Sequence, residues 1–155
     1  MNMDNASEMK VIRVIPGSSI AVDVSQFIRA EWGDLAIAEY LRLPIIKEHS
    51  ELPFFLVGIL CDSVVAFGGI FDNDMPDRPL LNPWLGCLFV ERNFRGRGFA
   101  RRIVSELLVV ADSTGCRPLF LFCDPTLVRF YSQFSWVMIE ERMFEGSAAV
   151  VMKRD

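Results

Sequence analysis

The chain has 155 residues, a length that suits one domain with a single hydrophobic core, and 52% of them are hydrophobic. Its formal net charge is −4 and its basic residues cluster at one turn, which excludes the broad basic face of a nucleic-acid-binding protein. The longest apolar run, 52–61, is shorter than the ~20 residues that span a bilayer, so we expect no membrane contact. The high apolar content allows an exposed patch and hence a homodimer.

The cysteines and the N-terminus indicate a reducing compartment. The four cysteines form no C-x-x-C pair and His49 is the single histidine, so we expect neither a zinc site nor a disulfide framework. Residues 1–9 are polar and lack the apolar core of a signal peptide. We therefore predict a cytoplasmic protein with a flexible lead-in at 1–9 and a single domain at 10–155.

The first half of the chain predicts strands and helices separated by Pro, Gly and Asp breakers. Ser18 or Ser19 can cap the first helix, and residues 61–63 suit the tight turn of a hairpin. In chain order the segments are a strand at 10–15, a helix to about residue 32, a second helix to about residue 43, an irregular connection at 45–52, strands at 54–60 and 64–71, an acidic loop at 72–81 and a strand at 84–90.

The second half begins with an amphipathic helix whose apolar residues repeat every four positions from Phe99 to Ala111. Gly115 stands where a helix C-cap belongs. A strand at 118–122, a short helix opened by Asp124 and Pro125, and a hairpin of strands at 136–144 and 147–153 complete the chain. The order β-α-α-β-β-β-α-β-α-β-β predicts a mixed α/β sheet with helices on both faces.

The turn between the 84–90 strand and the central helix has the composition of an anion site. The first N–H groups of a helix have no partner within the helix, and the macrodipole adds positive potential there. Gly96 and Gly98 let the backbone approach a phosphate, and Arg95, Arg97 and Arg101 add permanent charge. No lysine follows the glycines as in a P-loop, and Arg101 stands where a dinucleotide fingerprint needs glycine, so both nucleotide motifs fail.

The pattern that does fit is [R/Q]-x-x-G-x-[G/A], with Arg95, Gly98 and Ala100 at its defined positions. It resembles the pyrophosphate motif of the GCN5-related N-acetyltransferase (GNAT) superfamily, and the chain is identified as a small, bacterial-type member. The segment around Tyr131 resembles the last helix of that subgroup, except that Ser135 replaces the usual glycine. Because that position often has a positive φ, serine should cost up to ~1 kcal/mol there.

The resemblance implies a GNAT-like fold, in which the parallel strands at 84–90 and 118–122 splay apart, and acetyl-CoA as co-substrate without a metal. The strand backbone would pair with the pantetheine arm, and the turn and helix start would bind the pyrophosphate. The cofactor-binding residues implied are Leu88, Phe89, Val90, Arg95, Gly96, Arg97, Gly98, Phe99, Ala100 and Arg101.

The resemblance also implies direct attack of a neutral amine on the thioester, without a covalent enzyme intermediate. Tyr131 matches the tyrosine that protonates the leaving thiolate in many relatives; the alternative is a core aromatic. No pattern identifies the base: Glu31, Asp72 and Asp74 are candidates through water, and each could instead be a surface carboxylate. The candidates for acceptor binding are Glu31, Trp32, Asp72, Asp74 and Trp84.

The acceptor follows least directly from the sequence. Asp72, Asp74 and Asp77 crowd one loop, where they would steer a cationic amine, or else form a plain solvated turn. The leading function is an acetyl-CoA-dependent N-acetyltransferase acting on a primary amine of a small molecule or peptide. The alternatives are a non-catalytic CoA-binding regulatory module with the same fold, and an interaction domain with an accidental anion turn.

Overall fold

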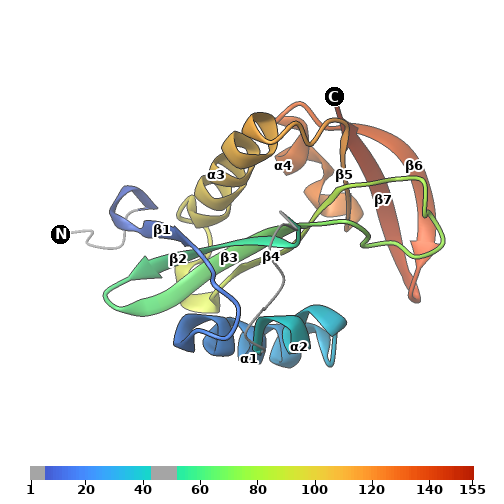
Figure 1. The fold of residues 1–155 in the computed structure, drawn as a ribbon. Coiled ribbons are helices and arrows are strands. Elements are labelled where there is room, and N and C mark those ends of the chain that lie inside the picture. Colours follow the sequence, from blue (N-terminus) through green and yellow to red (C-terminus); the bar gives the residue numbers. More distant parts are fainter. Residues whose placement is uncertain (1–5, 43–51) are drawn as a thin grey trace. The chain divides into compact units, whose positions relative to one another are not determined.

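The computed structural model describes residues 6–42 and 52–155, so His49 and most of the predicted connection at 45–52 lie outside the described residues. The predicted order of helices and strands and the mixed α/β class are confirmed, and the strands form one seven-stranded sheet in the order β1-β2-β3-β4-β5-β7-β6 (Figure 1). The elements are β1 (Lys10–Arg13), α1 (Ser19–Trp32), α2 (Ala36–Arg42), β2 (Phe54–Leu60), β3 (Ser63–Phe71), β4 (Trp84–Val90), α3 (Phe99–Ser113), β5 (Leu119–Cys123), α4 (Val128–Ser132), β6 (Val137–Phe144) and β7 (Ser147–Arg154).

The chain divides into two compact units, and two of its strands and one helix contribute to both. Unit 1 comprises Met1–Gly69 and Cys87–Leu107, and unit 2 comprises Ile70–Gly86 and Leu108–Asp155. The boundaries therefore fall within β3, β4 and α3. The sequence predicts one domain at 10–155, and that assignment stays a prediction.

Unit 1 encloses β3 between two helices that lie on opposite faces of the sheet (Figure 1). Phe67 faces α1, where its ring lies 6.2 Å from that of Phe27 between centroids. Gly68 faces α3, since a Cβ added there would lie 3.1 Å from Leu107 and 3.2 Å from Ile103. Side chains alternate along a strand, so successive residues serve the two faces. Glycine at 68 thus allows α3 to approach the sheet closely.

Part of the predicted flexible lead-in has a defined structure in unit 1. Ala6–Glu8 forms a 3-10 turn, and the Met9 side chain is buried. A Cβ on Gly58 of β2 would lie 2.1 Å from the Met9 sulfur, so this glycine makes the space for the thioether. Arg102 of α3 donates through Nη1 to the carbonyl of Ala6 at 2.8 Å. These contacts hold residues 6–9 against the unit. The assignment of 1–9 as a flexible lead-in stays a prediction.

Unit 2 is centred on β5, which pairs in parallel with β4 and antiparallel with β7. The parallel pairing of β4 and β5 was predicted, and Trp84 lies opposite Phe120 in it. Met75, Trp84, Phe120 and Val151 form a buried cluster beside this pair. A strand covered on both faces has no need of polar alternation, which accounts for the unbroken Leu-Phe-Leu-Phe-Cys run of β5.

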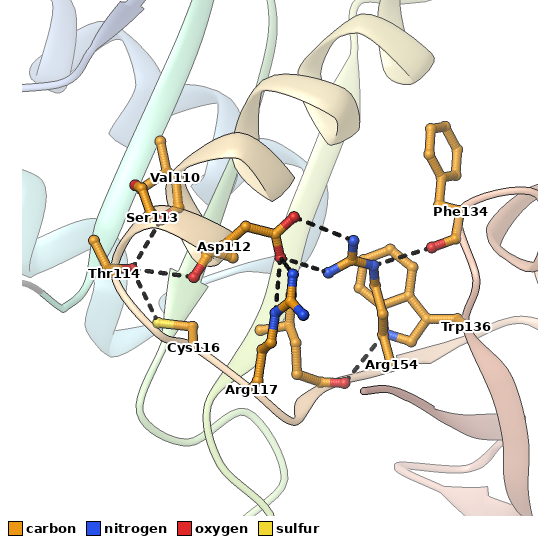
Figure 2. A network of polar contacts seen from close by, with 11 residues as sticks. Val110, Asp112, Ser113, Thr114, Cys116, Arg117, Phe134, Trp136 and Arg154 are labelled. Atoms are coloured by element: carbon orange, nitrogen blue, oxygen red, sulfur yellow. Dashed lines mark hydrogen bonds and ion pairs between the residues drawn. The ribbon is translucent and has the colours of Figure 1, made fainter.

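Asp112, near the end of α3, joins two distant segments of unit 2 (Figure 2). Its carboxylate accepts a hydrogen bond from Arg154 Nη1 at 3.0 Å, and this bond is the main reason why the pKa of Asp112 lies below its usual range. Arg154 also donates through Nε to the carbonyl of Phe134 at 3.1 Å, and its guanidinium lies over the Trp136 ring. The network therefore holds both neighbours of Ser135.

Positive φ angles occur at the turns where the sequence predicts them. The β2–β3 turn has φ of +49° at Cys61 and +62° at Asp62, as type I′ hairpins require, and the β6–β7 turn follows the same pattern. Ser135 has φ of +71°, which confirms that the glycine of related helices is replaced at a left-handed position. A β-carbon is unfavourable in that conformation, so the chain carries local strain here.

Replacing Ser135 with glycine should raise the melting temperature by roughly 2–4 °C, because glycine removes a Cβ penalty of up to ~1 kcal/mol. Thermal unfolding followed by circular dichroism measures this shift. Ser135→Ala is the matched control: alanine keeps the Cβ, so its melting temperature should not rise. A glycine variant that melts with the wild type would contradict strain at this position.

Candidate functional site

The segment that connects β4 to α3 is a short 3-10 turn followed by an exposed, glycine-bearing stretch, all within unit 1. The 3-10 turn, Arg92–Phe94, begins at Glu91, whose carboxylate accepts the N–H of Asn93 at 2.9 Å. Phe94 packs edge-on against the buried ring of Phe99, with 5.8 Å between centroids. The segment is therefore anchored at its start and at the first residue of α3, and residues 95–98 between them are exposed.

Gly96 and Gly98 shape the exposed stretch through positive φ angles of +76° and +86°. A Cβ added to Gly96 would meet no atom within 4 Å, so the space beside its backbone is open. The first i→i−4 bond of α3 runs from the N–H of Arg102 to the carbonyl of Gly98 at 3.1 Å. The N–H groups of Phe99 and Ala100 precede that bond, at the positive end of the helix dipole. This geometry suits an anion.

Arginine side chains surround the same stretch. Arg95 donates through Nε to the carbonyl of Val90 at 2.8 Å, and its guanidinium carbon lies 5.7 Å from the centroid of Phe89. These two contacts leave the Arg95 side chain exposed at the turn while limiting its freedom. Arg97 and Arg101 are exposed as well. The predicted phosphate-binding residues are thus brought together on one turn with a concentrated positive charge.

Strand β4 carries an irregularity that no sequence pattern reveals. Cys87 has φ of +50° inside the strand, which interrupts the pleat as a β-bulge does. Leu88, Phe89 and Val90 follow and are half-buried. Phe89 stacks on Phe67 with 5.1 Å between centroids and an interplanar angle of 22°. Its side chain is therefore engaged in packing, and the strand can offer a ligand its backbone.

Two predicted acceptor residues lie at the end of α1 in unit 1. Glu31 is exposed, and Trp32 is 40% exposed. The indole of Trp32 contacts Phe67 and Phe89 edge-on, at centroid distances of 6.5 and 6.2 Å. Trp32 thus extends the aromatic packing beside β4 to the surface, where an apolar part of a substrate could contact it.

Tyr131, the predicted general acid, is the buried residue of α4 in unit 2. Its ring lies edge-on to Phe130 at 5.0 Å and to Trp136 at 5.8 Å between centroids. Burial raises the pKa of the phenol well above its ordinary value, and the neighbouring Cys123 adds to the shift. The phenol therefore carries its proton at neutral pH, as a general acid must.

Cys123 of β5 shows why a thiol nucleophile is disfavoured in unit 2. The thiol is buried, and this burial raises its pKa to about 11, with a smaller contribution from the carboxylate of Asp124. Because the thiolate is the reactive form, a thiol that stays protonated at neutral pH is a poor nucleophile.

The three aspartates of the loop between β3 and β4 differ in their surroundings, and steering of a cationic amine by this loop stays a prediction. Asp77 accepts a hydrogen bond from Arg142 Nη2 at 2.5 Å, and this bond holds the pKa of Asp77 below its usual range. Arg78 pairs with Glu140 of β6, with 3.1 Å between its Nε and the carboxylate. Asp72 is exposed. The ion pairs tie the loop to β6 and neutralise part of its charge.

Asp74 differs from its neighbours in that loop, because its carboxylate lies against the backbone of β4. A Cβ added to Gly86 would lie 2.5 Å from Asp74 Oδ2, so only glycine leaves room for the carboxylate. Burial raises the pKa of Asp74 to about 7, and the nearby Glu145 carboxylate contributes to the rise. Asp74, a predicted acceptor residue, thus has a pKa near neutrality.

Trp84, a predicted acceptor residue, lies in the core instead. Its side chain is fully buried, and its indole N–H donates to the carbonyl of Leu81 at 2.5 Å. The ring packs against Phe120 and Phe122 at centroid distances of 5.8 and 6.3 Å. A side chain enclosed in this way offers no exposed surface in this structure. Acceptor binding by Trp84 stays a prediction.

Sequence reasoning did not single out three residues of the site: Gly86, Cys87 and Glu145. A glycine inside an otherwise apolar strand signals a bulge or a close approach, and Gly86 carries that signal. The positive φ of Cys87 has no sequence signature. Glu145 acts through its distance from Asp74, which depends on the folded chain.

Residues 6–42 and 52–155 are the part of the chain that the structure describes. In that part of the chain, no group of three or more His, Cys, Asp or Glu side chains is arranged to hold a metal ion. Nor do the same residues include a helix with the length and apolar character needed to cross a bilayer.

Asp74→Asn should stabilise the protein above pH 7 but not below pH 4. The folded pKa of Asp74 is about 7 against an ordinary value of 3.8, so the folded state binds one proton more than the unfolded state between these values. Wild-type stability thus falls as pH rises through this window, and the asparagine variant lacks that loss. One pKa unit is worth ~1.4 kcal/mol, so we expect melting temperatures at pH 8 to differ by at least about 2–4 °C. Equal wild-type and variant melting temperatures at pH 4 and pH 8 would contradict the raised pKa.

Comparisons with known proteins agree with this geometry. The model of the acetyltransferase (GNAT) family matches residues 21–136. A probable glucosamine 6-phosphate N-acetyltransferase 2 from Oryza sativa subsp. japonica is 34% identical, over 34% of this chain and 43% of the relative, so the match spans less than half of that protein.

Solved structures share the fold at low sequence identity. An acyl-CoA N-acyltransferase from Pseudomonas aeruginosa superposes with a TM-score of 0.72 at 14% identity, covering 95% of this chain and 99% of that one. A GNAT family acetyltransferase from Elizabethkingia anophelis with acetyl-CoA bound superposes with a TM-score of 0.66 at 9% identity, covering 96% and 98%. Since the family model covers most of the chain and includes the turn at 95–100, the chain belongs to the acetyltransferase (GNAT) family.

Proposed function

We propose that the protein is an acetyl-CoA-dependent N-acetyltransferase that moves the acetyl group directly from the thioester to a primary amine. The observation that carries the proposal is the turn from Arg95 to Ala100, in which two glycines with positive φ lead into the N-terminus of α3. Family membership and a neighbour whose structure contains acetyl-CoA support the same co-substrate. No step of the reaction calls for a metal.

The phosphate turn would hold the pyrophosphate of the co-substrate. The open space beside Gly96 admits a phosphate to the backbone, and the N–H groups at the start of α3 supply donors. Arg95, Arg97 and Arg101 add guanidinium forks, which match phosphate oxygens.

The backbone of Leu88, Phe89 and Val90 would pair with the pantetheine arm as an added strand would. The interruption at Cys87 supports this role, because a bulge takes the following residues out of the regular ladder. A backbone N–H near Leu88 would stabilise the oxyanion that forms when the amine attacks the carbonyl carbon.

Tyr131 would donate its proton to the CoA thiolate as the carbon–sulfur bond breaks. The phenol is protonated at neutral pH, as a general acid must be. The cysteines need not take part, because the amine attacks the thioester itself.

The acceptor would be a primary amine on a small molecule or peptide, and an amino sugar phosphate is one candidate. The name of the rice relative points to glucosamine 6-phosphate, although that match covers 34% of this chain. Trp32 and Glu31 at the end of α1, and Asp72 and Asp74 on the β3–β4 loop, are the residues we propose for acceptor binding.

A homodimer in the cytoplasm remains our expectation for the protein in the cell. Strand β6 lies at the edge of the sheet. It exposes four large apolar side chains, Val137, Met138, Ile139 and Met143. Exposed apolar groups on an edge strand favour contact with another chain.

Arg95→Ala should weaken CoA binding about 10- to 100-fold, because one hydrogen bond to a charged group contributes ~1.5–3 kcal/mol. Pantetheine, which lacks the pyrophosphate, should bind the variant and the wild type equally. Isothermal titration with both ligands measures this, and Arg92→Ala on the neighbouring 3-10 turn is the matched control. An equal loss for both ligands would show that Arg95 acts through the fold of the turn.

Tyr131→Phe should lower kcat by about 10- to 1000-fold with little change in KM for acetyl-CoA, because general acid catalysis acts in the transition state. Thiol release is followed with glucosamine 6-phosphate, spermidine, kanamycin and a peptide with a free N-terminus as acceptors. Wild-type turnover in the variant would show that Tyr131 is a core aromatic residue without a catalytic role. Binding of acetyl-CoA without transfer to any amine would favour the regulatory module.

A further inference from the structure

The Asp74 carboxylate lies against β4 immediately before the break at Cys87. We propose that the Asp74 carboxylate is the base that takes the proton from the acceptor amine, an inference that rests on the proposed function. Glu31 and Asp72, the other candidates from the sequence, are exposed side chains. Asp74 is half-buried and lies against Gly86 of β4, the residue that precedes the break at Cys87.

Gly86 creates the space that Asp74 occupies. A Cβ at position 86 would lie 2.5 Å from Asp74 Oδ2 and 3.2 Å from the Phe71 ring. The φ of Gly86 is not positive, so its backbone does not require glycine and the lack of a side chain has a packing reason. Glycine at position 86 therefore allows the Asp74 carboxylate to lie directly against the backbone of β4.

The residues on either side of Asp74 hold it in place. The side-chain oxygen of Asn73 accepts the N–H of Met75 at 2.9 Å, which closes a tight turn around Asp74. The Met75 side chain is fully buried in the cluster with Trp84. Its sulfur lies 3.6 Å from Arg142 Nη1. A carboxylate held between a closed turn and a buried anchor has little freedom to move, as a base requires.

The charges around Asp74 favour a base that works near neutral pH. Glu145, on the β6–β7 turn, is a second carboxylate that raises the pKa of Asp74, after burial, to about 7. Gly86 and Phe71, which contact it from β4 and β3, are uncharged. On its own loop, Asp72 is exposed.

The other charged residues near this loop are engaged with one another. Arg78 pairs with Glu140, and Arg142 pairs with Asp77. The ordinary cause of a low carboxyl pKa, a neighbouring guanidinium, acts on Asp77 and not on Asp74. A base with a pKa close to the working pH transfers protons most effectively.

The proposed step conserves protons and electrons. Asp74 takes one proton from the ammonium group, and the nitrogen lone pair then attacks the thioester carbon. The carbon–nitrogen bond forms and the carbon–sulfur bond breaks, and the leaving thiolate takes a proton from Tyr131. The second proton on nitrogen restores the tyrosine, and Asp74 releases its proton to solvent. The products are the amide, the CoA thiol and one proton.

The test is the pH profile of kcat/KM for the best acceptor of the amine panel, from pH 5.5 to 9.5. In the wild type the rate should rise with pH through an apparent pKa near 7. Asp74→Asn should lower kcat/KM at pH 7 by about 10²- to 10⁴-fold and remove the rise near pH 7 from the profile. Its deficit should shrink at high pH, where the amine loses its proton without a base.

Glu145→Gln should shift the rise of kcat/KM to lower pH, since it removes one of the causes that raise the pKa of Asp74. Gly86→Ala should lower the rate by displacing the carboxylate. Asp62→Asn, an isosteric change on the exposed β2–β3 turn, is the matched control and should leave the profile unchanged.

A titration of the Asp74 carboxyl carbon by NMR in the full chain gives a reading that does not depend on activity. A midpoint near 7 supports the proposal, and a midpoint near 4 overturns it. If Asp74→Asn keeps kcat/KM within about threefold of the wild-type value and has the same pH profile, Asp74 is not the base. The proposed function would still stand, because acetyl transfer persists in that variant. A wild type that transfers acetyl to no amine would overturn the proposed function and the base together.

Discussion

The break in β4 at Cys87 is the constraint on which the candidate site depends. A strand with regular pleats pairs its backbone with both neighbours, and it has no group left for a ligand. The positive φ at Cys87 ends that regularity in the middle of the strand. Before the break, Trp84 is fixed in a core and Gly86 adjoins Asp74. After it, three residues lead to the phosphate turn. One strand thereby packs in a core along its first half and carries, along its second half, the backbone that we propose to bind the pantetheine arm.

The two units differ in the way in which they control charge. In unit 1, guanidinium groups and a helix N-terminus gather positive potential on an exposed turn. In unit 2, burial favours the neutral forms of Asp74, Cys123 and Tyr131, whose pKa values are all raised. Phosphate binding needs permanent charge that stays in water until the ligand arrives. Proton transfer needs groups that gain and lose charge, and partial burial provides them.

The sequence predicts the fold better than the site. Strands β2 and β4 have the predicted ends, because apolar runs of this length are bounded by proline, glycine and aspartate. The start of α3 follows from its four-residue repeat, and the phosphate turn from a motif of defined spacing. Trp84 illustrates the limit: an aromatic residue at the head of a strand looks the same in the sequence whether it packs in the core or meets a substrate.

Asp74 shows the same limit for the chemistry. Its charge depends on a glycine in β4 and a glutamate in the β6–β7 turn, which the fold brings to it from distant parts of unit 2. Met9 is a second case, since its burial needs the glycine at position 58. Periodicity and local motifs are short-range signals. They cannot report which distant residue leaves room for another.

The ion pairs between the β3–β4 loop and β6 bear on how such enzymes can be redesigned. Here Arg78 and Asp77 have their partners on β6, in Glu140 and Arg142. A transplanted loop would leave two charged strand residues without counterions. A chimera built on this chain therefore needs to exchange β6 together with the loop.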